Sequence, residues 1–184
     1  MGLPLIDLGK GKGRGEGEGT DAQVAQRIDA ALCSVGFFGI VGHGVPVPVV
    51  AAAFDAGHRF FALSQKDKER WHIDGWPLKR GFDPIGWQAL DPGQIGPAPG
   101  AFVVNIGDMM QCWTNDRWPS TMHRVINKIS GRGRWSIAYF FDLDAESRIE
   151  PLPSCVTATR PSRYAPITAG EHLIEMYRKT TVAA

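Results

Sequence analysis

The amino-acid sequence predicts an α+β fold, because segments with helical periodicity come first and strand-like segments follow them. Helical patterns occupy most of the stretch from residue 20 to residue 70, and strand patterns recur at residues 101–106 and 135–141. We therefore expect helices followed by an antiparallel sheet. The chain has 184 residues, of which 43% are hydrophobic, and this composition excludes wholesale disorder.

The first predicted element is a short apolar strand at Pro4–Leu8. Glycine then occupies every odd position of residues 9–19, and we interpret this stretch as a solvated loop. A phosphate-binding loop is the alternative. It is disfavoured because the G-x-G-x-x-G spacing is absent and because Glu16 and Glu18 would repel a phosphate.

A helix is predicted after this loop, because Thr20 and Gln23 have the spacing of a capping box and Gly36 suits a helix end. Later elements follow from apolar runs, which indicate strands, and from apolar residues three or four apart, which indicate helices. In chain order these are a buried strand at Phe37–Val41, a helix from Val49 to near Leu63, a charged helical continuation at Ser64–Arg70, a turn-rich stretch at Trp71–Pro99, strands at Ala101–Ile106 and Trp135–Phe141, and a closing helix at Ala169–Arg178.

The charge balance disfavours nucleic acid and anionic lipid as partners, because 20 Lys and Arg residues face 19 Asp and Glu residues. The three cysteines contain no C-x-x-C pair, which excludes a disulfide framework and a cysteine-type zinc site. The first residues lack the pattern of a secretion signal, and the longest apolar run is too short to span a bilayer. We expect a soluble protein of the reducing cytoplasm.

Three polar residues in the second half of the chain are candidates for a binding site. His123 lies between the two strand candidates. Arg134 directly precedes the second candidate, and Ser136 is its second residue. Residues two apart on a strand share a face, so Arg134 and Ser136 are able to reach one ligand. An arginine fork beside a hydroxyl suits a carboxylate. An ordinary surface arginine is the competing interpretation of this pair alone.

Several short sequence segments, through their order and spacing, support the interpretation of these three residues as a binding site. In the second half they are N-I-G-D at 105–108, W-T-N-D-R-W with H-R-V at 113–125, R-W-S at 134–136 and F-F-D at 140–142; in the first half they are P-L-I-D-L at 4–8, G-F-F at 36–38, H-G-V at 43–45, F-F at 60–61 with K-D-K at 66–68, and R-G-F at 80–82. Together they resemble the isopenicillin N synthase-like Fe(II)/2-oxoglutarate-dependent dioxygenases.

The resemblance implies a partial double-stranded β-helix, or jelly roll, with N-terminal helices and a C-terminal helix. Residues 1–94 would form the N-terminal region, including the glycine-rich loop, and residues 95–184 the C-terminal half of the jelly roll. His123 matches the distal histidine ligand of iron, and Arg134 and Ser136 match the pair that binds the far carboxylate of 2-oxoglutarate. The implied reaction couples oxidative decarboxylation of 2-oxoglutarate to oxidation of a small molecule, with Fe(II) as the cofactor.

The sequence departs from this family at the segment that should supply the first two iron ligands. The family carries an H-x-D segment well before N-I-G-D, and here that stretch is deleted around Gln94–Gly96. The H-x-D at His72–Asp74 precedes the R-G-F segment and aligns with a linker, so we do not assign it to iron. We expect impaired activity, open sheet edges at residues 101–106 and 135–141, and self-association through these edges.

Two alternatives to an active oxidoreductase stay open. One is a non-catalytic remnant that binds 2-oxoglutarate or a protein partner, and the other is a fragment created by a damaged gene or a gene-model error. The sequence does not identify the primary substrate, nor does it distinguish hydroxylation from desaturation or ring closure. For the remaining histidines we expect structural positions: a turn for His43, a partly buried or surface position on a helix for His58, and solvent for His172.

Overall fold

The computed structural model describes residues 3–9, 20–75, 81–82, 100–123 and 135–180, without the side chains of Asp74 and Thr180. The chain divides into two compact units. Unit 1 comprises residues 1–44, 91–125 and 141–184, and unit 2 comprises residues 45–90 and 126–140. The predicted loop at 10–19, the boundary at 94–95 and the deletion point at 94–96 lie outside the described residues.

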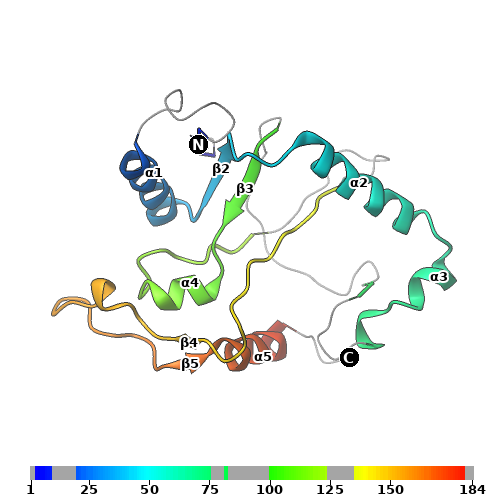
Figure 1. Ribbon diagram of the computed structural model, residues 1–184. Helices are drawn as coiled ribbons and strands as arrows, with labels where there is room; N and C mark the ends of the chain where they lie inside the picture. Colours follow the sequence, from blue (N-terminus) through cyan, green and yellow to red (C-terminus); the bar gives the residue numbers. More distant parts are fainter. Residues whose placement is uncertain (1–2, 10–19, 76–80, 83–99, 124–134, 181–184) are drawn as a thin grey trace. The chain divides into compact units, whose positions relative to one another are not determined.

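Unit 1 contains a three-stranded sheet with the order β1-β2-β3 (Figure 1). Its strands are β1 (Leu5–Asp7), β2 (Phe37–Val41) and β3 (Phe102–Asn105). β1 runs parallel to β2, with Ile6 opposite Ile40, and β3 runs antiparallel to β2, with Val104 opposite Phe38. All three strands were predicted. The sheet is mixed rather than purely antiparallel, and the expectation that residues 101–106 lack a partner is wrong, because β2 supplies one.

Helix α1 (Asp21–Ser34) covers this sheet and begins as predicted. The side chain of Thr20 accepts a hydrogen bond from the backbone N–H of Gln23, and the Gln23 side chain accepts one from the Thr20 N–H. This reciprocal capping satisfies two donors that every helix start leaves unpaired. The buried side of the helix then packs on the sheet in a core of Ile6, Ala31, Leu32 and Phe38.

The remainder of unit 1 is a second small layer with its own core. It contains α4 (Asp108–Trp113), β4 (Arg148–Ile149), the 3₁₀ turn η2 (Pro153–Cys155), β5 (Ile167–Thr168) and α5 (Ala169–Thr180). β4 and β5 pair antiparallel, and Cys112, Ile149 and Ala169 are buried together between these elements. Helix α5 confirms the predicted closing helix, whereas α4 was not anticipated.

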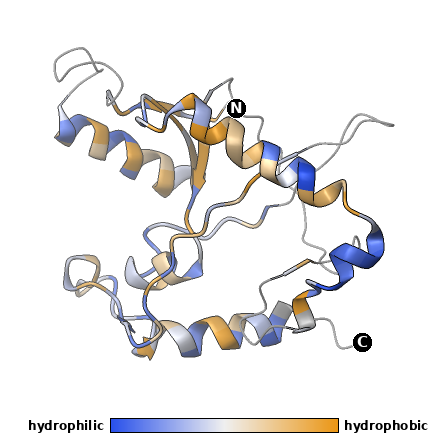
Figure 2. Cartoon of the chain, turned by 45° about the vertical axis from the view of Figure 1, so that its right-hand side comes forward, coloured by the Kyte–Doolittle hydropathy of each residue, from blue (hydrophilic) through white to orange (hydrophobic). Residues whose placement is uncertain are grey.

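Unit 2 contains α2 (Val47–Phe61), α3 (Gln65–Glu69) and the 3₁₀ turn η1 (Ile73–Gly75), and it confirms the two predicted helical segments. No described residue of α2 is buried, although the helix is strongly apolar, as its orange colouring in Figure 2 shows. Aromatic rings provide its packing. Phe61 lies 5.4 Å from Trp135 and 6.4 Å from Phe82, measured between ring centroids.

The predicted strand at Trp135–Phe141 does not form. These residues form no regular secondary structure, belong to neither of the sheets in the described part of the chain, and have exposed side chains. Strand pairing needs a neighbouring strand, and no described residue provides one here. Helices and sheets are both present, as the α+β prediction requires. No helix in the described part of the chain has the length and apolar character needed to cross a membrane.

Candidate functional site

His123 lies in unit 1, and one nitrogen of its ring is hydrogen-bonded to the backbone. Its Nδ1 lies 2.9 Å from the carbonyl oxygen of Thr121, and its ring meets that of Phe37 edge-on with centroids 4.9 Å apart. A carbonyl only accepts hydrogen bonds, so Nδ1 carries the proton and donates it. With the proton on Nδ1, Nε2 is the nitrogen through which the uncharged form of this ring would ligate a metal.

The backbone before His123 is fixed against the end of α1. Thr121 Oγ1 donates a 2.9 Å hydrogen bond to the carbonyl oxygen of Val35, the residue that caps this helix. Gly36 adopts φ +76°, and a Cβ atom at this position would overlap Thr121 Oγ1. Only glycine combines this left-handed conformation with so close an approach. The helix end thereby sets the position of the segment that carries His123.

A buried turn at Asn115 fixes the other end of this segment. Asn115 is fully buried and adopts φ 52°, followed by Asp116 at φ 63°. The Asn115 side-chain amide donates to the carbonyl oxygens of Cys155 at 3.2 Å and Pro161 at 3.0 Å, and its oxygen accepts from the N–H of Arg163 at 3.0 Å. These three bonds tie the turn to the loop between η2 and β5.

The neighbouring carboxylate of Asp116 strengthens the same junction. It accepts hydrogen bonds from Gln111 Nε2 at 2.9 Å, from Arg163 Nη1 at 2.8 Å and from the Tyr164 hydroxyl. Burial acts to raise the pKa of Asp116, but the hydrogen bonds from Tyr164, Arg163 and Gln111 outweigh it and lower the pKa below its ordinary value. Asp116 is therefore held as an anion by its donors.

Asp29 of α1 forms a third anchor for the segment. Its two oxygens accept hydrogen bonds from Arg117 Nη2 at 2.6 Å and from the indole Nε1 of Trp118 at 2.8 Å. The Trp118 hydrogen bond lowers the pKa of Asp29 against the effect of partial burial, and Arg117 lowers it further. The segment from Trp113 to His123, which we call the anchored segment, is thus bonded to α1 on one side and to the 155–164 loop on the other.

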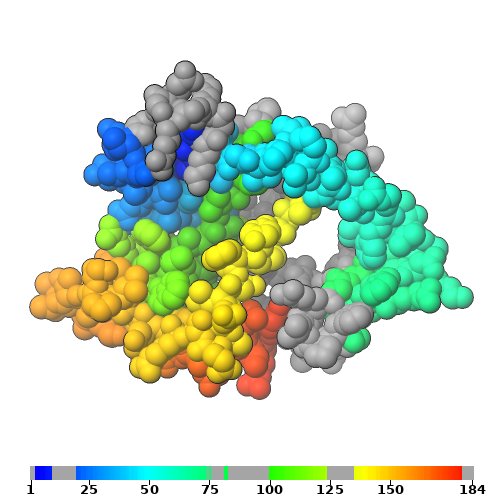
Figure 3. Space-filling view, viewed as in Figure 1, coloured from blue at the N-terminus to red at the C-terminus, as the bar shows by residue number. Residues whose placement is uncertain are grey.

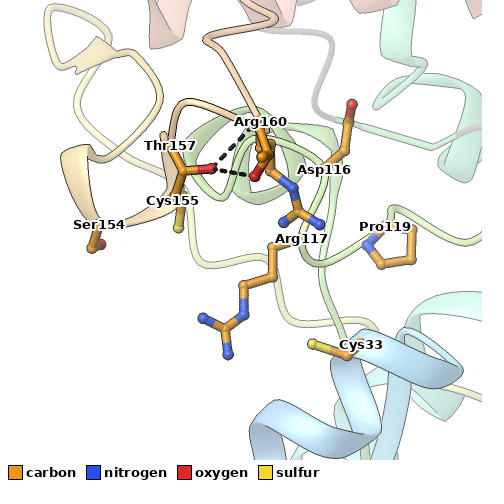
Figure 4. A pocket seen from close by; sticks show the side chains of 9 residues that line it. Cys33, Asp116, Arg117, Pro119, Ser154, Cys155, Thr157 and Arg160 are labelled. Atoms are coloured by element: carbon orange, nitrogen blue, oxygen red, sulfur yellow. Dashed lines mark hydrogen bonds between the residues drawn. The ribbon is translucent and has the colours of Figure 1, made fainter.

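An open cavity of about 700 Å³ lies beside the anchored segment, within unit 1. Figure 4 shows the Arg117 side chain extending between Cys155 and Cys33. The lining is largely polar and consists of Cys33, Asp116, Arg117, Pro119, Ser154, Cys155, Thr157, Thr159 and Arg160. His123 is not part of this lining, so the cavity is separate from the residues that the sequence analysis selected.

Comparison with known proteins identifies the family. Residues 3–128 match a model described as the N-terminal region of the non-haem dioxygenases in morphine synthesis, which is more than half of the chain. The chain belongs to the 2-oxoglutarate-dependent dioxygenase family. This confirms the resemblance at the level of the 2-oxoglutarate-dependent dioxygenase family, whereas the isopenicillin N synthase-like grouping and the internal deletion stay predictions.

Similar proteins within this dioxygenase family agree with the assignment. The chain is 42% identical over 100 residues to the 2-oxoglutarate-Fe(II) type oxidoreductase hxnY of Emericella nidulans. The matched region covers 52% of this chain and 28% of hxnY. Across three of its curated relatives, the chain spans only 24–42% of their length.

Solved structures of this family share the fold. A 2OG-Fe(II) oxygenase family protein from Caulobacter crescentus is similar with a TM-score of 0.78 and 19% identity, covering 96% of this chain and 98% of that one. The structure of JOX2 in complex with 2OG, Fe and JA is similar with a TM-score of 0.70 and 20% identity, covering 95% of this chain and 85% of JOX2. At these identities the likeness concerns the fold alone.

The candidate dioxygenase residues are only partly described. His123 lies in unit 1 and Ser136 in unit 2, where it is exposed, and Arg134 lies outside the described residues. His72 forms an isolated bridge with Phe82, and Ile73–Gly75 is a 3₁₀ turn. The His72–Asp74 motif therefore lies at a turn and not within a regular strand.

The described residues suit one ligand of the family's iron but not a complete set. His123 has the tautomer that a metal ligand needs. In the part of the chain that the structure describes, however, no three His, Cys, Asp or Glu residues come together in a group able to hold a metal ion. A facial triad of two histidines and one carboxylate is therefore not found there.

Two residues behave differently from the sequence-based expectations. His172 was expected in solvent, but it is only 6% exposed, because α5 turns it towards the core around Ala169, and its Nε2 lies 3.4 Å from Asp108 Oδ2. The structural role of Asn115 was missed. Its signal was the Asn-Asp pair, since these residues tolerate the left-handed conformation better than other non-glycine residues. His58 lies on the exposed surface of α2, as expected.

Proposed function

We propose that this chain is an oxidoreductase of the Fe(II)/2-oxoglutarate type whose own iron chemistry is impaired. The observation that carries the proposal is the orientation of His123, whose Nδ1–H donates to Thr121 and whose Nε2 makes no hydrogen bond within the described part of the chain. A metal-ligating histidine characteristically donates its second ring N–H to such an acceptor. His123 would bind iron through Nε2.

The rest of the proposed site comes from the family assignment. Arg134 and Ser136 would bind the far carboxylate of 2-oxoglutarate, within a partial jelly roll of the isopenicillin N synthase-like type. Bound Fe(II) would supply the oxidative decarboxylation of 2-oxoglutarate coupled to oxidation of a small molecule. Relatives whose names state small-molecule chemistry, such as the homoarginine-6-hydroxylase of Oryza sativa, support this substrate class. We place the reaction in the cytoplasm.

Impairment is proposed because one histidine is a poor iron site by itself. Affinity and selectivity for Fe(II) come from several ligands that converge in a fixed geometry. The internal deletion inferred around residues 94–96 would remove the other histidine and the carboxylate. The lack of a three-ligand group among the described residues favours the second candidate, a non-catalytic remnant that binds 2-oxoglutarate or a protein partner.

An anaerobic titration of the purified chain with Fe(II) in the presence of 2-oxoglutarate tests the proposal. The readout is the weak visible absorption band of a chelated iron complex, together with succinate formation after oxygen is admitted. We expect weak binding, no measurable succinate, and loss of the residual band in His123→Ala. His58→Ala is the matched control, because His58 is an exposed histidine of α2.

Two results would contradict this assignment. Tight binding that requires both His123 and His72 would show that the His72–Asp74 motif rebuilds the triad, and the chain would then be a competent enzyme. A band of unchanged intensity in His123→Ala would remove His123 from the site. If folded protein gave no band, the oxidoreductase proposal would fail and the non-catalytic remnant would be favoured.

A further inference from the structure

The open cavity of about 700 Å³ beside the anchored segment has walls from several parts of unit 1. Cys33 comes from α1, Arg117 from the anchored segment, Ser154 from η2 and Arg160 from the 155–164 loop (Figure 4). Figure 3 shows this loop in orange against the green anchored segment, to which Asn115 bonds it. Small-molecule sites occupy about 300–1,000 Å³, so the cavity has the size that a ligand needs.

The charges around the cavity leave one positive charge without a partner. Arg117 Nη2 lies 2.6 Å from Asp29 Oδ2. Asp116, the acidic residue of the lining, has Arg163 Nη1 at 2.8 Å from its Oδ2. The Arg160 side chain, in contrast, makes no hydrogen bond or ion pair within the described part of the chain. The cavity therefore carries a net positive charge, which attracts an anion.

A tight turn at Thr157–Arg160 brings hydrogen-bond donors together at one wall of the cavity. The backbone N–H of Thr157 donates to the carbonyl oxygen of Arg160 at 2.9 Å, and the Arg160 N–H donates to Thr157 Oγ1 at 3.0 Å. The hydroxyl oxygens of Thr157 and Thr159 lie 3.2 Å apart. The buried Asn115 amide bonds to backbone carbonyl oxygens on both sides of the turn. The backbone of the turn is thereby fixed before a ligand arrives, which reduces the ordering cost of binding.

We propose that this cavity binds the phosphate group of a small phosphate monoester, with Arg160 as its main charge partner. Arginine suits this role because its planar fork donates two parallel hydrogen bonds to phosphate oxygens. Figure 4 shows the Arg160 side chain reaching from the turn towards Arg117. Arg117 has N–H groups to add, because its contact with Asp29 engages Nη2 and a guanidinium carries five N–H donors.

The donors of the lining favour a phosphate over a carboxylate. A phosphate group presents three acceptor oxygens, whereas a carboxylate presents two. Besides the two guanidinium groups, the lining offers the hydroxyls of Ser154, Thr157 and Thr159. These hydroxyls also suit a hydroxylated organic part, such as that of a sugar phosphate. The inference does not depend on iron or 2-oxoglutarate, since His123 is not part of this lining.

Equilibrium dialysis of the full chain against labelled inorganic phosphate, at constant ionic strength, tests the proposal. We expect saturable binding, and at least a tenfold weaker affinity in Arg160→Gln, because the main charge partner is lost. The variant should keep its fold, which circular dichroism checks, since the Arg160 side chain is exposed. Arg148→Gln is the matched control, because Arg148 is an exposed arginine of unit 1 outside the lining. Absence of saturable binding, or an equal loss in both variants, would overturn the proposal.

Two further probes test the chemical class of the ligand in the same dialysis. Ribose 5-phosphate should bind more tightly than inorganic phosphate, because its hydroxyls find partners in the polar lining. Acetate should compete with phosphate only weakly, because a carboxylate satisfies fewer of the donors. A sugar phosphate that binds no better than inorganic phosphate, or acetate that competes as well as phosphate, would contradict the assignment to a phosphate monoester.

Alkylation of Cys33 by iodoacetamide tests the location of the ligand. Cys33 is exposed and lines the cavity, and peptide mass spectrometry measures its rate of reaction. Phosphate should slow this reaction, because a bound negative charge disfavours the thiolate that attacks the reagent. The slowing should be absent in Arg160→Gln. Phosphate that binds without changing the rate at Cys33, or that slows it equally in Arg160→Gln, would place the ligand elsewhere and overturn the site.

Discussion

The anchored segment and the segment Trp135–Phe141 both carry residues of the proposed dioxygenase site, yet they differ in how they are held. The anchored segment has its polar groups bonded to α1 and to the 155–164 loop, and Asn115 within it is fully buried. The second segment has exposed aromatic side chains and no backbone hydrogen bond to described residues. The contacts of a segment therefore decide how firmly its residues are held: hydrogen bonds fix the anchored segment, whereas the second segment is held by ring contacts of Trp135 with His58 and Phe61.

The largest effect is expected from removing the buried amide of the anchored segment. Asn115→Ala removes the hydrogen bonds to two carbonyl oxygens and one N–H group of the 155–164 loop, and it places alanine at a positive φ. We expect the free energy of unfolding to fall by about 3 kcal/mol, a sum of lost hydrogen bonds and backbone strain. Urea unfolding monitored by circular dichroism measures this change.

Asn105→Ala is the control for the Asn115 substitution. Asn105 is exposed at the end of β3, and its side chain makes one local hydrogen bond of 3.3 Å to the carbonyl oxygen of Ile106. Its removal should cost less than about 0.5 kcal/mol, as for other exposed surface positions. Similar losses in the two variants would mean that the buried turn does not stabilise the fold.

A smaller effect is expected from Asp29, and it should depend on pH. The folded chain lowers the pKa of this carboxyl below 3.8, so Asp29 stabilises the fold above the unfolded-state pKa and loses this contribution as pH falls through the folded-state value. Asp29→Asn should cost about 1 kcal/mol at pH 7, and the difference from the native chain should shrink as pH falls through the folded-state pKa of Asp29.

Urea unfolding at a series of pH values measures the Asp29 contribution. Asp55→Asn, a charge change on the exposed surface of α2, is the matched control. The contrary result is a difference in unfolding free energy between the native chain and Asp29→Asn that stays constant from pH 7 to about pH 2.5. That result would show that the stabilisation by Arg117 and Trp118 does not depend on the charge of Asp29.

The smallest effect on stability is expected in the exposed segment. Tyr139→Ala removes a side chain that is 87% exposed, so the free energy of unfolding should change by less than about 0.5 kcal/mol. The measurement is made at protein concentrations where sedimentation shows monomer. A decrease of about 2 kcal/mol or more in the free energy of unfolding would contradict this expectation, because it would mean that Tyr139 is packed within one chain.

Local signals made much of the fold predictable from the sequence. The capping box of Thr20 and Gln23 and the glycine at position 36 act through neighbours a few residues away, and α1 follows them closely. The three strands of unit 1 were recognisable as apolar runs. Their pairing was not, because the parallel contact of β1 with β2 is decided by how α1 folds back and not by either strand's composition.

The predictions that were wrong share one physical cause: the structure at these positions depends on residues far away in the sequence. The pattern of Trp135–Phe141 is that of a strand, but a strand forms only beside another strand. His172 was expected in solvent because it lies near the C-terminus, but the small residues Ala169 and Gly170 allow α5 to approach Ala145. For the site, the sequence could nominate His123 from its neighbouring segments, whereas the turn that positions it became visible only in the contacts of Asn115.

The central position of β2 has a consequence for the order in which the chain folds. Its partner β1 is synthesised before it and its partner β3 some sixty residues after it, with all of α2 and α3 made in between. During synthesis the β1-α1-β2 unit is therefore complete while one edge of β2 is still open. The backbone of Phe37–Ile40 forms that edge, so in this interval its unpaired N–H and C=O groups expose the nascent chain to mispairing.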